Sequence, residues 1–379
     1  MRSSGEPGAC DPCLRRAWLV GSLSARIERS LGGRPGGRAR ELLALPDETL
    51  AAAVGGGPEI VAQASEREGS RLRAAVAGAG AWACCRHDPE FPESVRRPAD
   101  APRVLFGRGN PRLLGRLHSD RCVTIVGARR PSAYGREMAE LLGRELGAAG
   151  LVVVSGMALG IDSCAHAGAL DAEGLTVAVL GSGPDVPHPM RMRKLHERIT
   201  ERGLVLSELP PGTTPRRWTF PARNRIMAAL SAMTVVVEGR ERSGSLITAT
   251  LAGEGGRDVG AVPGRVGSAT AAGPNSLLHQ GAHVIRGGQD VLDVLCGVGA
   301  QPRGSSVPGA PAATVPPELA AVLVEVDGGA ATQDEVARGA GLDPAMAAVA
   351  LTRLELLGLL ACDSAGRYRR TLRRAEEVA

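Results

Sequence analysis

Short apolar runs, almost continuous and rich in Val and Leu, recur along the middle of the chain, and helical segments fill the gaps between them. Runs of this kind are typical of parallel strands that are buried on both faces. With right-handed crossovers, the alternation of strands and helices predicts a doubly wound, Rossmann-like sheet. The predicted strands are Val123–Val126, Leu151–Ser155, Thr176–Leu180, Leu204–Ser207, Met233–Val237 and Val259–Val262, and His283–Ile285 can form a seventh.

The patterns on either side of this sheet region are different. Residues 12 to about 80 form short helical segments between Gly-rich turns, and residues 89–110 form a connector rich in Pro and Gly. Residues 297–315 contain Gly, Pro, Ala and Ser without an apolar period, and three helical segments and a hairpin follow in the order of a winged helix. We therefore predict an α/β protein with a small N-terminal helical (SAM-like) domain at 1–88, a Rossmann-like core at 89–296, a flexible linker at 297–315 and a winged-helix domain at 316–379.

The composition is that of a folded protein with several cores. The chain has 379 residues, of which 44% are hydrophobic and 22% are charged, so intrinsic disorder and a disulfide-stapled mini-protein are excluded. No apolar run reaches the roughly 18 residues that cross a bilayer. Arg15 and Arg16 precede a short apolar stretch, but serines interrupt it and charged residues follow, which favours an amphipathic helix over a secretion signal. We expect a cytoplasmic protein that does not enter the membrane.

The basic charge carries information only where it is clustered. The net charge is +5, but Lys194 is the single lysine among 45 basic residues, so the number of arginines alone is a weak signal. Between Leu209 and Val237 there is no Asp or Glu, and two rings, Trp218 and Phe220, lie among Arg216, Arg217, Arg223 and Arg225. Cations that hold phosphates and rings that stack on bases are the ingredients of single-strand recognition. The rings can equally anchor the helix that follows. A second basic stretch contains Arg191, Arg193, Lys194 and Arg198.

Turns of small residues follow three of the predicted strands. In the first, Arg129 stands where a dinucleotide-binding turn has its second glycine, which argues against nicotinamide or flavin. Gly127 and Arg129 at a helix N-terminus suit a single phosphate instead. The second turn contains Ser155 and Gly156, and the third contains Ser243, Gly244 and Ser245.

Asp162 and His166 lie one helical turn apart after the second strand. This spacing can place an acid and a base together for proton transfer. We expect instead that they cap and pack the helix, because the sequence offers neither a nucleophile nor a third orienting group nearby.

Four metal-ligand side chains form two short motifs near the N-terminus. Without a secretion signal we expect a reducing compartment, in which most cysteines are free thiols. Cys10 and Cys13 form C-x-x-C, and Cys84 and His87 form C-x-x-H. Together they make the ligand set of a structural Cys3His zinc site, although the segment between the motifs is long. We expect no other cofactor.

Several segments taken in order resemble the core of the DprA/Smf family, DNA-processing protein A, over about residues 90–290. They are VGARRPSAYG, VVVSGMALGIDSCAHAGAL, TVAVLGSGPD, LSELPPGTTPRRWTFPARNRIMAALS, SGSLITA and NSLLHQGAHVI. The resemblance implies an extended Rossmann core that binds single-stranded DNA without catalysis. It also implies a homodimer that passes incoming strands to the RecA recombinase during natural transformation.

The same resemblance implies roles for individual residues. Gly127 and Arg129 would belong to a first phosphate site, with Ser155 and Gly156 beside it. A central basic pocket would be lined by Arg223, Asn224 and Arg225, with Ser243, Gly244 and Ser245 at its far wall. The chain departs from the family pattern at His188, where a Tyr is common, and a histidine ring can partly replace a tyrosine in stacking.

Two other functions compete with DNA binding. Related Rossmann-like enzymes hydrolyse nucleotide-derived substrates and resemble one another in a PGG-x-GT-x-x-E loop that supplies a glutamate. The chain has neither this loop nor an acid at the matching place after SGSLITA, so we do not expect an enzyme. In the other alternative the protein is an adaptor that acts through its winged helix, and partner binding would then survive loss of the core arginines.

Overall fold

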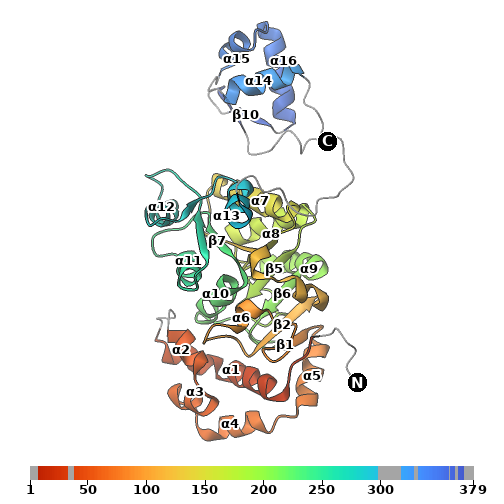
Figure 1. The fold of residues 1–379 in the computed structure, drawn as a ribbon, viewed down its shortest axis with the longest axis vertical. Helices are drawn as coiled ribbons and strands as arrows, with labels where there is room; N and C mark the ends of the chain where they lie inside the picture. Colours follow the sequence, from red (N-terminus) through yellow and green to blue (C-terminus); the bar gives the residue numbers. More distant parts are fainter. Residues whose placement is uncertain are drawn as a thin grey trace. The chain divides into compact units, whose positions relative to one another are not determined.

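The computed structural model describes residues 7–32, 38–297, 317–327, 332–357, 359–362 and 366–370. The chain divides into two compact units, Met1–Ser305 and Ser306–Ala379, coloured red to cyan and blue in Figure 1. Apart from Gly297, the predicted linker lies outside the described residues.

A sheet of nine strands forms the centre of the first unit, in the order β1-β2-β6-β5-β4-β3-β7-β8-β9. The strands from β6 to β9 along this order are parallel, as the continuous apolar runs predict. All seven predicted strands are present, with ends that move by one residue at most. They are β3 (Cys122–Val126), β4 (Val152–Ser155), β5 (Thr176–Leu180), β6 (Leu204–Ser207), β7 (Met233–Val236), β8 (Asp258–Ala261) and β9 (His283–Val284).

Two further strands extend one edge of the sheet. β1 (Trp82–Cys85) pairs antiparallel with β2 (Val104–Gly109), and β2 pairs antiparallel with β6. Residues 89–110 are therefore more than a connector, and the prediction for this segment is wrong. β1 has only four residues, and β2 follows a Pro-rich stretch, so neither shows a clear strand pattern in the sequence.

Helices cover both faces of the sheet because successive strand residues point to opposite sides. Val177 and Val179 of β5 pack in the core that contains Ile226 of α10, whereas Ala178 and Leu180 pack with α8 and α9. The helices of this region are α6 (Glu93–Arg96), α7 (Ala133–Ala148), α8 (Ile161–Asp171), α9 (Arg193–Arg202), α10 (Thr219–Leu230), α11 (Gly244–Glu254), α12 (Ala272–His279) and α13 (Gly288–Cys296), with 3-10 turns at Pro111–Arg116, Ser119–Arg121 and Met190–Met192.

Five helices of the described chain precede the sheet and gather at its β1–β2 edge (Figure 1). They are α1 (Asp11–Ser30), α2 (Arg38–Ala44), α3 (Asp47–Ala53), α4 (Pro58–Ser65) and α5 (Gly69–Gly78). Leu19 and Leu23 of α1 share a buried core with Trp218, whose indole N–H donates to the Ser24 carbonyl oxygen at 3.1 Å. Trp218 is therefore a buried anchor between the N-terminal helices and α10, and the base-stacking interpretation does not apply to this ring.

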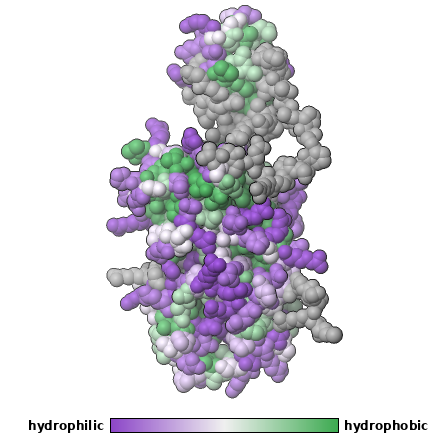
Figure 2. Space-filling model, in the orientation of Figure 1, coloured by the Kyte–Doolittle hydropathy of each residue, from purple (hydrophilic) through white to green (hydrophobic). Residues whose placement is uncertain are grey.

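In the second unit, the described residues form three helices, α14 (Pro317–Asp327), α15 (Gln333–Gly339) and α16 (Pro344–Leu356), and an antiparallel pair, β10 (Leu360–Cys362) and β11 (Tyr368–Arg370). Hydrophilic side chains cover most of the visible surface of the first unit, with a hydrophobic patch in its upper part and smaller hydrophobic areas below (Figure 2). Within the described residues, no helix is both long and apolar enough to span a bilayer.

Candidate nucleic-acid interface

A cavity of about 310 Å³ lies where β3 ends and α8, α10 and α11 begin. In parallel α/β sheets, ligands bind beyond the carboxyl ends of the strands, and this cavity occupies that position. Seven predicted site residues line it: Gly127, Arg129, Arg223, Asn224, Ser243, Gly244 and Ser245. Five others do not line it: Ser155, Gly156, Arg191, Lys194 and Arg225.

Phe220 forms an aromatic surface at this cavity. The Arg129 guanidinium carbon lies 5.6 Å from the centre of the Phe220 ring, and the His188 ring centre also lies 5.6 Å from it. Burial, and then the charge of Arg129, lower the pKa of His188, so its ring is neutral at physiological pH. Arg129 is exposed and makes no ion pair within the described part of the chain. The cavity therefore offers a stacking surface beside an unneutralised cation.

Arg223 forms the floor of the cavity and is 7% exposed. Its Nη1 group donates to the Gly156 carbonyl oxygen at 2.8 Å and to the Val179 carbonyl oxygen, and its Nε group donates to Asn224 Oδ1 at 3.0 Å. Burial lowers the pKa of Arg223 to about 10, and Asp162 opposes this shift. A guanidinium held in this way positions the loops around the cavity. Its hydrogen bonds fit that role better than a grip on an external phosphate.

The turn at Gly156 is already closed by a carboxylate of the protein itself. Asp162 Oδ2 accepts the Gly156 N–H at 3.1 Å and the Ala158 N–H at 3.4 Å. Burial raises the pKa of Asp162, and Arg223 opposes that change. The Ser155 hydroxyl donates to the Ile125 carbonyl oxygen at 2.6 Å. The groups that would bind an anion at Ser155 and Gly156 therefore already have internal partners, which disfavours the predicted phosphate site.

The start of α7 is closed in the same way. Glu238 accepts hydrogen bonds from the Ser132 N–H at 2.9 Å and from the Ser132 hydroxyl at 2.7 Å. Gly127 does not begin this helix, which starts at Ala133. A Cβ atom on Gly127 would lie 2.6 Å from Ile161 Cγ1 and 2.7 Å from the Glu238 carbonyl oxygen, so glycine is needed there for close packing.

The start of α11 is open. Its N-cap residue, Ser243, makes no side-chain hydrogen bond to a backbone N–H of the first turn, and its hydroxyl pairs with the Ser245 hydroxyl at 2.6 Å instead. Nothing lies within 4 Å of a Cβ atom placed on Gly244. Unpaired amides and the helix dipole make such an end attractive to anions. Of the three helix N-termini predicted to bind phosphate, that of α11 has the open geometry that anion binding needs.

Arg225 lies on another side of α10 and is 6% exposed. Its guanidinium donates to Glu208 Oε1 at 2.7 Å and to the Asp100 and Ala222 carbonyl oxygens at 2.9 and 2.7 Å. The prediction that Arg225 lines the same pocket as Arg223 is therefore wrong. It borders a second cavity, of about 720 Å³, where Arg40 is paired with Asp100 and Glu254. The paired charges of that cavity leave no net basic surface.

Arg191 and Lys194 lie apart from the cavity, on the 3-10 turn Met190–Met192 and on α9. Both side chains are exposed, and neither has an ion-pair partner within the described segments.

Asp162 and His166 do not form an acid-base pair. The His166 Nδ1 atom lies 2.7 Å from the Thr176 hydroxyl, and burial lowers the pKa of His166 to about 3. The His166 ring is therefore neutral and serves to pack α8 against the sheet.

Among the residues of the cavity wall that the sequence patterns did not identify, Ile247 is an exposed apolar side chain. Ile247 is 39% exposed and lies three residues after Gly244, on the same side of α11. Residues at this spacing share a helix face, so the spacing could have identified it.

Cys84 does not lie with the other predicted metal ligands. Neighbouring strand residues face opposite sides, so Cys84 packs in the core with Leu105, while Cys85 faces α1 and lies near Cys10. The predicted ligand set is wrong at this position, because Cys85 stands in the place assigned to Cys84.

The chain is similar to known proteins over most of the first unit, which contains the nine-stranded sheet. The profile of the family described as DNA recombination-mediator protein A matches residues 82–296. The chain belongs to this family. A DprA relative from Mycobacterium tuberculosis is 40% identical over 298 residues, which are 78% of this chain and 72% of that protein. The DNA processing protein DprA of Bacillus subtilis is 41% identical over 206 residues, 54% of this chain and 68% of that protein.

Solved structures of the family have the same fold. The chain matches DNA processing protein A from Streptococcus pneumoniae with a TM-score of 0.59 and 32% identity, over 75% of this chain and 98% of that one. It matches DNA processing protein A from Helicobacter pylori with a TM-score of 0.50 and 32% identity, over 54% of this chain and 92% of that one. The Helicobacter pylori structure is described in terms of a single-stranded DNA binding mode.

Proposed function

We propose that this protein binds single-stranded DNA at the cavity between the end of β3 and the starts of α8, α10 and α11. The carrying observation is the arrangement of Arg129, Phe220 and the open start of α11 around one cavity. Arg129 and the α11 amides hold phosphates, and the Phe220 ring stacks on a base. Membership of the family and the single-stranded DNA described for the Helicobacter pylori protein support this function.

The proposed contacts select single strands over duplexes. A ring can stack on a base only where that base is free of its partner strand, and Phe220 is a half-buried ring at the cavity. Phosphates and ring faces are common to all sequences, so affinity changes little with base composition. Arg191 and Lys194 are exposed cations that can extend the path of the backbone along α9.

The wider role that we propose is that of a recombination mediator without catalytic activity of its own. In this role a cytoplasmic homodimer protects incoming single strands during natural transformation and delivers them to the RecA recombinase. The second unit, with its three helices and one antiparallel strand pair, acts as a winged helix that holds DNA or a protein partner. The family description supports the role of recombination mediator, and the other parts follow from the resemblance described in the sequence analysis.

The binding proposal is tested by fluorescence anisotropy with a labelled single strand and a duplex of equal length over a salt series. We expect tighter binding of the single strand and a straight line of log affinity against log salt, with a slope of about −0.7 for each phosphate contact. Several base sequences should bind alike. Equal or tighter binding of the duplex at every salt concentration, or no measurable binding of single strands, would overturn the proposal.

A further inference from the structure

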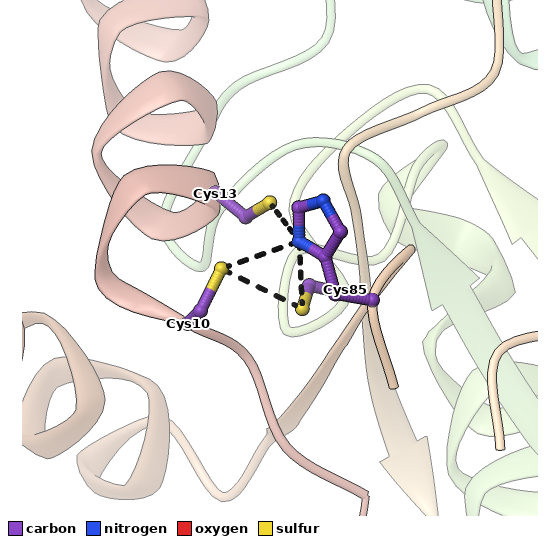
Figure 3. Close-up of side chains that lie close together, drawn as sticks. Cys10, Cys13 and Cys85 are labelled. Atoms are coloured by element: carbon purple, nitrogen blue, oxygen red, sulfur yellow. Dashed lines mark hydrogen bonds between the residues drawn. The ribbon is translucent and has the colours of Figure 1, made fainter. Parts of the chain in front are cut away.

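Three thiols and one imidazole from two distant segments meet beside the start of α1. Cys10 is the N-cap residue of this helix and Cys13 lies in its first turn, while Cys85 ends β1 and His87 follows in the next turn. Figure 3 shows the three sulfur atoms around one ring nitrogen. The four ligand atoms all lie within 4.8 Å of one another.

Four of the separations between these atoms lie within about 0.5 Å of the edges of a zinc tetrahedron. Zn–S bonds of about 2.3 Å and Zn–N bonds of about 2.0–2.1 Å place two sulfurs about 3.8 Å apart and a sulfur and a nitrogen about 3.5 Å apart. The Sγ atoms of Cys10 and Cys85 are 3.8 Å apart. His87 Nδ1 lies 3.5 Å from the Cys10 sulfur, 3.4 Å from the Cys13 sulfur and 4.0 Å from the Cys85 sulfur. One ion at the centre can therefore reach all four ligands without rearrangement of the backbone.

We propose that Cys10, Cys13, Cys85 and His87 bind one structural Zn²⁺ ion. Thiolate and imidazole ligands favour zinc over hard cations such as magnesium and calcium. Four protein ligands fill the tetrahedron and leave no position for water or substrate, so the ion has no catalytic role. A disulfide accounts for the cluster less well, because it would join two of the three thiols and leave the third beside the imidazole without a function.

Hydrogen bonds around the four ligands join the segment before α1 to the end of β1 and the turn that follows it. The Cys85 N–H donates to the Gly8 carbonyl oxygen at 3.1 Å, and the Gly8 N–H donates to Asp88 Oδ2 at 2.9 Å. Cys13 and Cys85 also belong to the core that joins α1 and α5 to β1 and β2. The ion thus fastens the N-terminal helices to the antiparallel edge of the sheet. His87 is exposed, which gives metal ions and chelators access to the site.

The test is metal analysis of the full chain purified without a His-tag. We expect about one zinc per chain in the unmodified protein. Cys85→Ser and Cys13→Ser should lose most of the metal, whereas Cys84→Ala and Cys164→Ser should keep it. Cys84→Ala is the sharpest control, since it removes the neighbouring thiol of the same strand.

A second measurement on the unmodified protein does not depend on how the variants fold. Replacement of the metal by Co²⁺ should give the thiolate-to-cobalt charge-transfer absorption and the visible bands of a tetrahedral site. A chelator should remove the ion and lower the melting temperature of the unmodified protein but not that of Cys85→Ser. Less than about half an equivalent of zinc after incubation with zinc and dialysis, or cobalt spectra without thiolate bands, would overturn the site.

Discussion

Two arginines of α10, Arg223 and Arg225, are separated by one residue yet belong to different parts of the molecule. Each helical residue advances the side-chain direction by about 100°, so these two guanidinium groups point to nearly opposite sides. Arg223 lies under the cavity near Asp162, and Arg225 is held by Glu208 and Asp100. Both are buried, whereas Arg129 on the cavity rim is exposed. Burial and existing partners, rather than local arginine density, decide which cation can bind DNA.

The largest expected effect is on stability, at Arg225. Arg225→Ala leaves the half-buried Glu208 carboxylate without its ion-pair partner and removes one of the two guanidinium groups near Asp100, which keeps Arg40; the loss should cost about 3 kcal/mol of unfolding free energy. Denaturant unfolding measures this loss. Single-strand affinity per folded molecule should stay unchanged when the active fraction is determined by titration. A stable Arg225→Ala protein with weakened DNA binding would place this arginine at the interface after all.

A smaller effect is expected at the exposed part of the cavity. Phe220→Ala removes the stacking surface and should weaken single-strand binding by about 1–3 kcal/mol, with little change in the salt slope. Phe220→Tyr keeps an aromatic ring at the cavity and serves as the matched control. Anisotropy titrations at fixed salt measure both variants. Equal affinities of the Ala variant and the unmodified protein would show that the ring serves packing alone.

The difference between closed and open helix starts can be tested at Gly244. Gly244→Asp adds at α11 the kind of carboxylate that Asp162 and Glu238 already provide at the other two turns, and there is room for it. An acid in the first turn favours the helix by about 0.3–1 kcal/mol. It should at the same time repel a DNA phosphate and weaken binding by roughly the same amount. Gly244→Asn has a similar shape without the charge and should bind more tightly than the Asp variant, and the reverse order would contradict an anion site there.

The parallel strands were predictable, whereas several site details depend on contacts between distant residues. Runs such as Thr176–Leu180 are short and almost continuously apolar, and every residue of this strand is buried. This pattern is typical of a parallel strand that is covered on both faces. No local pattern indicates that Asp100 and Glu208 meet Arg225, or that Asp162 turns back to the Gly156 amide. The sequence therefore predicted an acid-free basic segment, while the acids that neutralise part of it come from outside that segment.

The metal ligands illustrate the same limit at the scale of one residue. The C-x-x-H spacing favours Cys84, but the direction of a side chain on a four-residue strand depends on which face packs inward. Leu105 and the sheet core take Cys84, so Cys85 is the thiol that turns toward α1. The sequence pattern does not reveal this strand, and without the strand the alternation that distinguishes the two cysteines cannot be predicted.

The central claim, that the cavity holds DNA phosphates through its exposed cation, is tested most directly by the salt dependence of Arg129→Ala. Arg71→Ala is the matched control, because Arg71 is exposed on α5 and its loss changes the net charge equally. We expect Arg129→Ala to bind single strands more weakly and to flatten the slope of log affinity against log salt by about 0.7, while Arg71→Ala leaves the slope unchanged. Identical slopes for the unmodified protein, Arg129→Ala and Arg71→Ala would contradict the account.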